Sequence, residues 1–199
     1  MGLSVLMTTT TKVASPRLHD YGADAVFGDE SVLSFSPCKG SLVFYAEHHT
    51  MDMKKWIAPR EEVLTALAGR YDVVLSEADG SRGLPLKIHT ERDPVIHPLT
   101  DATIAVMGLW GIGEKVCYAV FGDDGMGIVD KEYIQHYIND PEGLMKGCTG
   151  RSAIVFNEAD SAPTESIAML KDIDYPDSVF AVAASEKEDR IYGIIRGCI

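Results

Sequence analysis

The sequence predicts an α/β protein with three layers, in which helices cover a mostly parallel sheet. Short apolar runs alternate with segments of helical periodicity through most of the chain, as in strand–helix–strand units. Several of these runs are apolar throughout, which is typical of strands buried on both faces. A length of 199 residues with 46% apolar residues suits a single domain spanning residues 1–199 with a substantial core.

In the first half of the chain, apolar runs favour short strands separated by turns. These strands are expected at residues 4–7, 24–28, 31–35 and 41–47. A helix is expected over residues 59–71. Its apolar side chains Val63, Leu64 and Leu67 share one face, which would pack against the sheet. Gly69 suits the end of this helix, because glycine is favoured where a helix stops.

In the second half of the chain, strands and helices alternate. A buried strand is expected at residues 71–77, because its apolar character is continuous. Further strands are expected at 103–108, 152–157, 178–185 and 190–197. Helices are expected at 130–140 and 161–173. Asp130 is the expected cap of the first helix, and Ser161 or Thr164 that of the second.

Charge and composition exclude several classes of partner. Lys and Arg number 18 against 30 Asp and Glu, and the net charge of −12 disfavours nucleic acid and anionic membranes. No apolar run reaches the roughly 20 residues of a membrane helix, and the first residues lack the pattern of a secretory signal. The four cysteines form no CxxC pair and are expected to be reduced thiols, which favours a cytoplasmic location.

The stretch EADGSRGLPLK places charged side chains where the strand at 71–77 should end. Ligands of open parallel sheets bind beyond the carboxyl ends of the strands. Glu77 and Asp79 have the chemistry to hold Mg²⁺ or to orient a water molecule for attack on phosphate. Arg82 and Lys87 would neutralise phosphate charge. The alternative is a charged surface turn in which the carboxylates pair with Arg82.

Three other strand ends carry polar side chains. TTTTK (8–12) offers hydroxyls for Mg²⁺ or phosphate and a point charge at Lys12, although threonine also favours strands for its shape alone. Asn157 and Asp160, in NEAD, suit the reading of a nucleobase edge, or else form a turn before the next helix. Ser185 ends the last of the four strands. Together the four ends favour a site for a small phosphorylated ligand along one edge of a sheet.

The segment EADGSRGLPLKIHTERDPVI (77–96) resembles the signature of the YqeC family, described as accessory proteins of selenium-dependent hydroxylases. The resemblance extends to TTTTK, to KKWIAPREEVLTAL (54–67), to GLWGIG and to NEAD, and covers most of residues 4–160. It implies the strand and helix order of P-loop NTPases. It also implies a role in the maturation of selenium-dependent molybdenum hydroxylases, with such a hydroxylase as the client protein.

The resemblance also implies roles for individual residues, with Mg²⁺ and a purine nucleotide as ligands. Glu77 and Asp79 would stand at a strand end similar to a Walker B motif, as catalytic and metal-binding groups. The implied phosphate-binding set is Thr10, Thr11, Lys12, Ser81, Arg82 and Lys87. Asn157 and Asp160 are similar to the base-reading NKxD motif of GTP-binding proteins, with Glu158 in place of the lysine.

The sequence departs from the resemblance at its front. Related proteins have a strand, a glycine-rich P-loop and a helix ahead of TTTTK, whereas no GxxxxGK[ST] occurs in this sequence. The N-terminal part of the fold is therefore expected to be incomplete, through a shortened sequence, a natural loss of catalysis, or a gap filled by residues 190–197 or a partner chain. Enzymatic activity and homo-oligomer formation stay open.

Three functions are compatible with these residues. The first is a nucleotide-dependent accessory protein of hydroxylase maturation. The second is a non-catalytic binding or scaffold protein of the same fold. The third is a metal-dependent phosphohydrolase or transferase built on Glu77 and Asp79.

Overall fold

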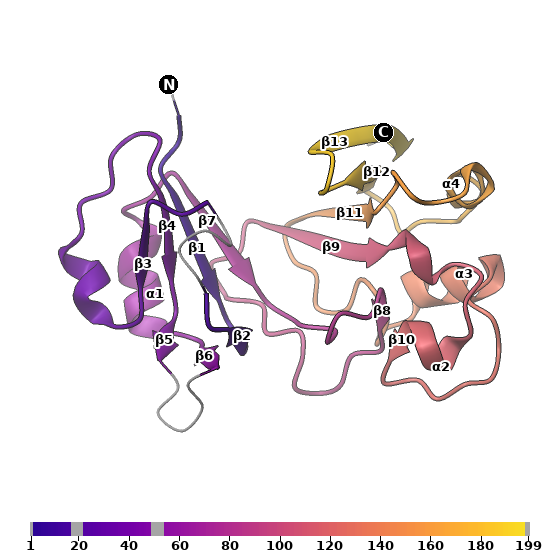
Figure 1. Cartoon of the computed structure of the whole chain (residues 1–199), viewed down its shortest axis with the longest axis horizontal. Helices are drawn as coiled ribbons and strands as arrows, with labels where there is room; N and C mark the ends of the chain where they lie inside the picture. Colours follow the sequence, from indigo (N-terminus) through magenta and orange to yellow (C-terminus); the bar gives the residue numbers. More distant parts are fainter. Residues whose placement is uncertain (1, 17–21, 49–53, 198–199) are drawn as a thin grey trace. The chain divides into compact units, whose positions relative to one another are not determined.

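The computed structural model describes residues 2–16, 22–48 and 54–197 (Figure 1). Contacts between residues divide the chain into an N-terminal unit, Met1–Gly80, and a C-terminal unit, Ser81–Ile199. Each unit combines helices with mostly parallel strands, so the α/β class is confirmed. The prediction of one domain over residues 1–199 and the predicted likeness to P-loop NTPases stay predictions.

The N-terminal unit is built on a parallel sheet with the strand order β3-β4-β1-β7. Its strands are β1 (Val5–Thr9), β3 (Ala25–Phe27), β4 (Leu42–Tyr45) and β7 (Val73–Glu77). A small antiparallel sheet has the order β2-β6-β5, with β2 (Val13–Ala14), β5 (Glu47–His48) and β6 (Lys55–Ile57). The helices are α1 (Glu61–Ala68) and the 3₁₀ helix η1 (Glu30–Ser34).

Two apolar clusters form the core of this unit. Leu6 packs with Val63 and Leu67 of α1, which confirms the predicted helix and its buried face. A second cluster gathers Phe44 and Trp56, where β6 of the small sheet contributes the tryptophan. Because alternate residues of β4 enter the two clusters, both faces of the main sheet are covered at its centre.

Two predictions for this unit are wrong. Residues 31–35 do not form a strand, because Asp29 accepts a hydrogen bond from the Ser31 amide at 2.9 Å and caps η1 instead. The strand expected at 71–77 exists as β7, but it is not buried, since Leu75 is 51% exposed. The strand is the last of its sheet, and neither core cluster, as the described residues form them, includes a β7 side chain.

The C-terminal unit has a four-stranded sheet with the order β13-β12-β11-β9. Its strands are β9 (Ala102–Gly108), β11 (Arg151–Asn157), β12 (Val179–Ser185) and the antiparallel β13 (Arg190–Arg196). A second pair joins β8 (Leu86–Lys87) to β10 (Val120–Phe121). The helices are η2 (Leu109–Gly111), α2 (Val116–Ala119), α3 (Lys131–Asn139) and α4 (Thr164–Leu170).

The core of the C-terminal unit lies on one face of this sheet. Met107 and Phe156 point from the strands into a cluster with Ile134 of α3 and Leu170 of α4, and all four are fully buried. The predicted cap of α3 is confirmed, because Asp130 accepts a hydrogen bond from the Tyr133 amide at 2.9 Å.

The predicted caps of the helix after β11 are wrong. α4 begins after Pro163, and no side chain caps it. Proline has a fixed φ that suits the start of a helix, so no serine or threonine hydroxyl is needed to set its first turn.

Two further observations bear on the expected location. Among the described residues, no helix has the length and apolar character needed to cross a membrane. Cys38, Cys117 and Cys148 are free thiols, while Cys198 lies outside the described residues.

Candidate functional site

In the N-terminal unit, the ends of β1 and β7 bring the threonine segment and the first acidic residue together. The parallel register aligns Thr9 with Glu77. The Glu77 carbonyl accepts hydrogen bonds from the Thr10 amide at 2.9 Å and from the Thr9 hydroxyl at 3.1 Å. The Thr11 amide donates to the Thr9 hydroxyl at 3.0 Å, which turns the chain towards the exposed Lys12. The segment is therefore folded onto the end of β7.

Thr8 was predicted only as part of the TTTTK segment and not as a phosphate-binding residue. The Thr8 side chain is 4% exposed, and its hydroxyl has no hydrogen-bond partner among the described residues. Most buried hydroxyl groups are paired, so the Thr8 hydroxyl is an exception near the end of β1. The run of four threonines was the available signal, but only the structure shows that the Thr9 and Thr10 hydroxyls bond the Glu77 carbonyl and that the Thr8 hydroxyl does not.

The Glu77 carboxyl carries an unfavourable charge in this structure. Although the residue is exposed at its strand end, desolvation of the carboxyl by nearby protein atoms raises its pKa, the neighbouring Asp79 raises it further, and Lys55 opposes both effects. A Cβ atom added at Gly80 would lie 3.7 Å from Glu77 Oε1, so the backbone of the glycine runs close beside the carboxylate. A bound cation would favour the ionised form of Glu77, which is the form that ligates metals.

The Mg²⁺ role of Glu77 and Asp79 stays a prediction. Within the described ranges, no group of three or more His, Cys, Asp or Glu side chains is placed to hold a metal ion. Two carboxylates nevertheless suit Mg²⁺, which proteins hold through one or two carboxylates while substrate phosphates and water complete its shell. The chemistry of the donors therefore fits a metal that arrives with a phosphorylated ligand.

In the C-terminal unit, Ser81 and Arg82 lie in a turn. The Ser81 hydroxyl donates to the Leu84 carbonyl at 2.6 Å, so it serves the turn itself. Arg82 has φ of 56°, and its exposed guanidinium stacks over the Phe121 ring at 4.9 Å from the centroid. A cation–π contact uses none of the N–H donors of the guanidinium, so Arg82 keeps them available for anions.

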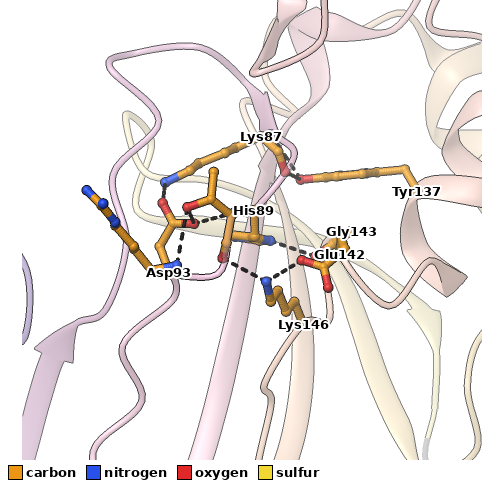
Figure 2. A network of polar contacts seen from close by, with 9 residues as sticks. Lys87, His89, Asp93, Tyr137, Glu142, Gly143 and Lys146 are labelled. Atoms are coloured by element: carbon orange, nitrogen blue, oxygen red, sulfur yellow. Dashed lines mark hydrogen bonds and ion pairs between the residues drawn. The ribbon is translucent and has the colours of Figure 1, made fainter.

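Lys87 lies inside a network of polar contacts, which Figure 2 shows. Its side chain is 7% exposed, and its ammonium group forms an ion pair with Asp93. Although burial opposes the shift, hydrogen bonds from Lys87 and Thr90 hold the pKa of Asp93 below its ordinary value. The Tyr137 hydroxyl accepts from the Lys87 amide at 3.1 Å and donates to the Lys87 carbonyl at 3.0 Å. The charge of Lys87, which was predicted to bind phosphate, is therefore already neutralised by Asp93.

The network continues into the segment that follows α3. His89 Nδ1 lies 2.8 Å from the Gly143 carbonyl, so this nitrogen carries the proton. The Lys146 ammonium donates to the Thr90 carbonyl at 2.7 Å and also pairs with Glu142. These contacts tie the second half of the EADGSRGLPLKIHTERDPVI segment to a distant loop (Figure 2), and they give that half a role in holding the unit together.

The predicted base-reading residues come together at the carboxyl ends of β11 and β12. Asn157 Oδ1 accepts from the Glu186 amide at 3.0 Å, and Asp160 Oδ1 accepts from the Ser185 hydroxyl at 2.7 Å. Lys187 Nζ lies 3.6 Å from Asp160 Oδ2. An open pocket of about 460 Å³ is lined by Asn157, Glu158, Asp160, Ser161, Glu186 and Lys187.

The carboxyl groups of this pocket are in different electrostatic states. The hydrogen bond from Ser185 lowers the pKa of Asp160. Burial raises the pKa of Glu158, and the charges of Asp160 and Glu186 raise it further. Glu158 adopts a left-handed φ of 67°, and its Oε2 atom lies beside Gly108, where an added Cβ would approach within 2.8 Å. The pocket thus presents mainly acceptors, which suit a ligand edge rich in N–H donors.

Together these features define an α/β protein whose polar side chains gather at the carboxyl ends of parallel strands. The model of the family described as YqeC protein matches residues 1–122, so the chain belongs to the YqeC family. The match includes the whole of residues 77–96, whereas the pocket beyond β11 lies outside it.

One curated relative is the uncharacterized protein YqeC of Escherichia coli strain K12. It is 36% identical over 118 residues, which cover 58% of this chain and 45% of the relative. The chain thus matches less than half the length of that relative. No solved structure matches the chain.

Proposed function

We propose that this protein binds a phosphorylated ligand of the purine nucleotide class and serves as an accessory protein in the maturation of selenium-dependent molybdenum hydroxylases. The observation that carries the nucleotide proposal is that Asn157 and Asp160 line one open pocket, with Asp160 held by the buried Ser185. The accessory role is supported by membership of the YqeC family and by the resemblance noted at residues 77–96.

The pocket supports purine recognition through complementary hydrogen bonding. Asp160 is held in place by Ser185, and its ionised carboxylate would accept ring and exocyclic N–H groups. Because Asn157 Oδ1 already accepts from Glu186, its amide nitrogen is directed to donate to a ring nitrogen or carbonyl. The Glu158 carboxyl turns to Gly108 and offers no aliphatic stem over the base, so we propose the purine class and not guanine alone.

The N-terminal unit holds a candidate phosphate site of its own, in which Thr10, Thr11 and Lys12 accompany Glu77 and Asp79. Mg²⁺, when bound, would neutralise phosphate charge and align a phosphate oxygen. Glu77 and Asp79 would hold the metal, and the exposed Lys12 would supply a further positive charge. Within the C-terminal unit, Arg82 would offer its N–H groups to an anion, since its contact with Phe121 uses none of them.

Isothermal titration calorimetry of the full chain with Mg²⁺–ATP and Mg²⁺–GTP tests this proposal. Saturable micromolar binding, worth roughly −8 kcal/mol, is expected for at least one nucleotide. Asp79→Ala should abolish the Mg²⁺-dependent part of binding and leave the fold intact. Asn157→Ala should weaken binding both with and without Mg²⁺. No heat with either nucleotide, or unchanged affinity in both variants, would contradict nucleotide binding at these residues.

A non-catalytic binding or scaffold protein is the second candidate. It is favoured by the ion pair of Lys87 with Asp93, which reduces the positive charge available to a transferring phosphate. Phosphate release during incubation with Mg²⁺–ATP or Mg²⁺–GTP distinguishes the two candidates. Binding without release would favour the scaffold. Metal-dependent release from simple phosphoesters with no preference for nucleotides would instead indicate a phosphohydrolase.

A further inference from the structure

The four-stranded sheet of the C-terminal unit has one covered face and one open face. Its outer strands leave large aliphatic side chains exposed: Ile104 (61%) and Val106 (57%) on β9, and Ile191 (65%) and Ile194 (61%) on β13. All four lie on the same face, as the registers below show. The opposite face contains the buried core described above. We call the exposed side the open face.

Strand register shows that the open face is continuous from β9 to β13. Ile104 and Val106 pair with Ala153 and Val155 of β11, and paired residues point to the same side of a sheet. Val155 pairs with Val182 of β12, which pairs with Ile194, and Ala184, two residues along β12, pairs with Ile191. None of these aligned positions carries a charge, and the exposed Arg151, which pairs with Ala102, lies on the same face only at the amino end of β11. Apolar surface therefore extends across all four strands.

The side chains of the open face differ in size between its middle and its edges. Ala153 and Ala184 lie on the middle strands, whereas the outer strands carry isoleucines. The larger Phe180 pairs with Ala153 nearer the amino end of β12. Three strand spacings separate β9 from β13, a distance of about 14 Å. An α-helix with its side chains is about 10–12 Å across, so one helix fits between the two aliphatic edges.

The parallel strands give a second reason to expect a helix. Parallel sheets occur with helices on both faces, because continuous apolar strands have no solvated side. β9, β11 and β12 are parallel, and the buried cluster that contains α3 and α4 residues lies on the other face. A helix supplied from outside this unit would complete the third layer that the sequence predicted.

The charge of the protein near the open face indicates which kind of helix would bind there. The chain has a net charge of −12, so a second copy would be repelled. The exposed turn that joins β12 to β13 contains Glu186, Glu188 and Asp189 with a single lysine. This turn follows the carboxyl end of β12, at one end of the open face. A helix with basic residues beside its apolar stripe would complement this charge.

We propose that the open face is a docking surface for an amphipathic α-helix of a partner protein, with an aliphatic stripe flanked by Lys or Arg. The helix would lay this stripe between the aliphatic edges, as in other complexes in which a helix occupies an apolar surface. Its apolar contacts come from residues outside the pocket beyond β11, whereas Glu186 of the acidic turn also lines that pocket.

A designed peptide tests the docking surface on the full chain. The probe is a helical peptide with leucines along one face and lysines along the other, and its affinity is measured by fluorescence anisotropy. Saturable binding is expected for this peptide. A scrambled peptide of the same composition, and a leucine–glutamate peptide with the same stripe, should each bind at least tenfold more weakly. Equal binding of either comparison peptide would overturn the proposal.

Variants locate the binding. Ile104→Gln with Ile194→Gln should weaken the leucine–lysine peptide at least tenfold, while Met126→Gln, at a 76% exposed methionine outside the sheet, should leave affinity unchanged. Hydrogen exchange on the unaltered chain gives an independent measurement, with slower exchange expected in β9 and β13 when the peptide is bound. Slowing confined to other segments would contradict the assignment. So would a dimer that the double variant abolishes while peptide binding persists, because a second copy would then occupy the open face.

Discussion

Two carboxylates near opposite ends of the segment EADGSRGLPLKIHTERDPVI differ in what surrounds them. Asp93 accepts from Lys87 and Thr90, and these donors lower its pKa in spite of burial. Glu77 is partly desolvated beside Asp79, and its pKa is raised. A carboxylate whose charge is already satisfied stabilises the fold, whereas one whose charge is unfavourable is suited to a ligand that restores the balance. A single family signature thus combines a structural part and a candidate ligand-binding part.

The largest expected effect comes from breaking the structural part. Asp93→Ala leaves the Lys87 ammonium nearly buried and without its carboxylate. We expect a loss on the order of 3 kcal/mol in the free energy of unfolding, near the lower end for broken buried pairs because Asp93 itself is 22% exposed. Urea unfolding measures the loss. Lys131→Ala, which removes an exposed ion pair with Asp172, should change stability by less than about 1 kcal/mol.

The same pair has a defined pH dependence. Because the folded-state pKa of Asp93 lies below its ordinary value of 3.8, its contribution is fully present above that value. The contribution is lost as pH falls through the folded-state pKa. The stability difference between the unaltered chain and Asp93→Ala should therefore shrink below about pH 4. A difference that stayed constant down to pH 2 would show that the ion pair is not its source.

Tyr137→Phe is the next largest perturbation of the network. The phenol is buried and bonds both the amide and the carbonyl of Lys87, so its removal leaves two backbone groups without this partner. A loss of about 2 kcal/mol in unfolding free energy is expected. Tyr118→Phe, at a 65% exposed ring, is the matched control and should be nearly neutral. Equal losses of stability in the two variants would show that the hydrogen bonds of the Tyr137 hydroxyl do not stabilise the protein.

How much of the difference between Glu77 and Asp93 could be predicted from the sequence depends on whether each feature follows from a local sequence pattern. Strand ends were predictable, because parallel strands bring their carboxyl ends to one edge; Thr9 beside Glu77, and Asn157 near Ser185, follow from that rule. The pairing of Lys87 with Asp93 was not predictable, since both lie in a segment without periodicity and residue types do not reveal partners. The exposure of β7 depends on its place in the sheet, which no local pattern encodes.

Glu77→Gln tests whether the charge of Glu77, unlike that of Asp93, destabilises the folded protein. The raised folded-state pKa means that ionised Glu77 opposes folding at neutral pH, and that this opposition disappears as pH falls through the folded-state pKa towards the ordinary value of 4.5. Without ligand, the variant should therefore have a higher urea midpoint than the unaltered chain at pH 7, with the difference vanishing below pH 4.5. Glu91→Gln in the exposed loop provides the control. A lower midpoint at pH 7 would place Glu77 among the structural carboxylates.

The smallest effect on stability is expected at the pocket beyond β11. Ser185→Ala removes the hydroxyl that donates to Asp160 and accepts from the Glu188 amide. Because this hydrogen bond is the main cause that lowers the pKa of Asp160, the pKa should rise towards its ordinary value of 3.8. NMR titration of the Asp160 carboxyl carbon measures the shift, and calorimetry with nucleotide measures the effect on binding. A shifted pKa with weaker nucleotide binding would show that Asp160, like Glu77, is a ligand-binding carboxylate. A shifted pKa with unchanged binding would instead show that the hydrogen bonds of Asp160, like those of Asp93, stabilise the fold.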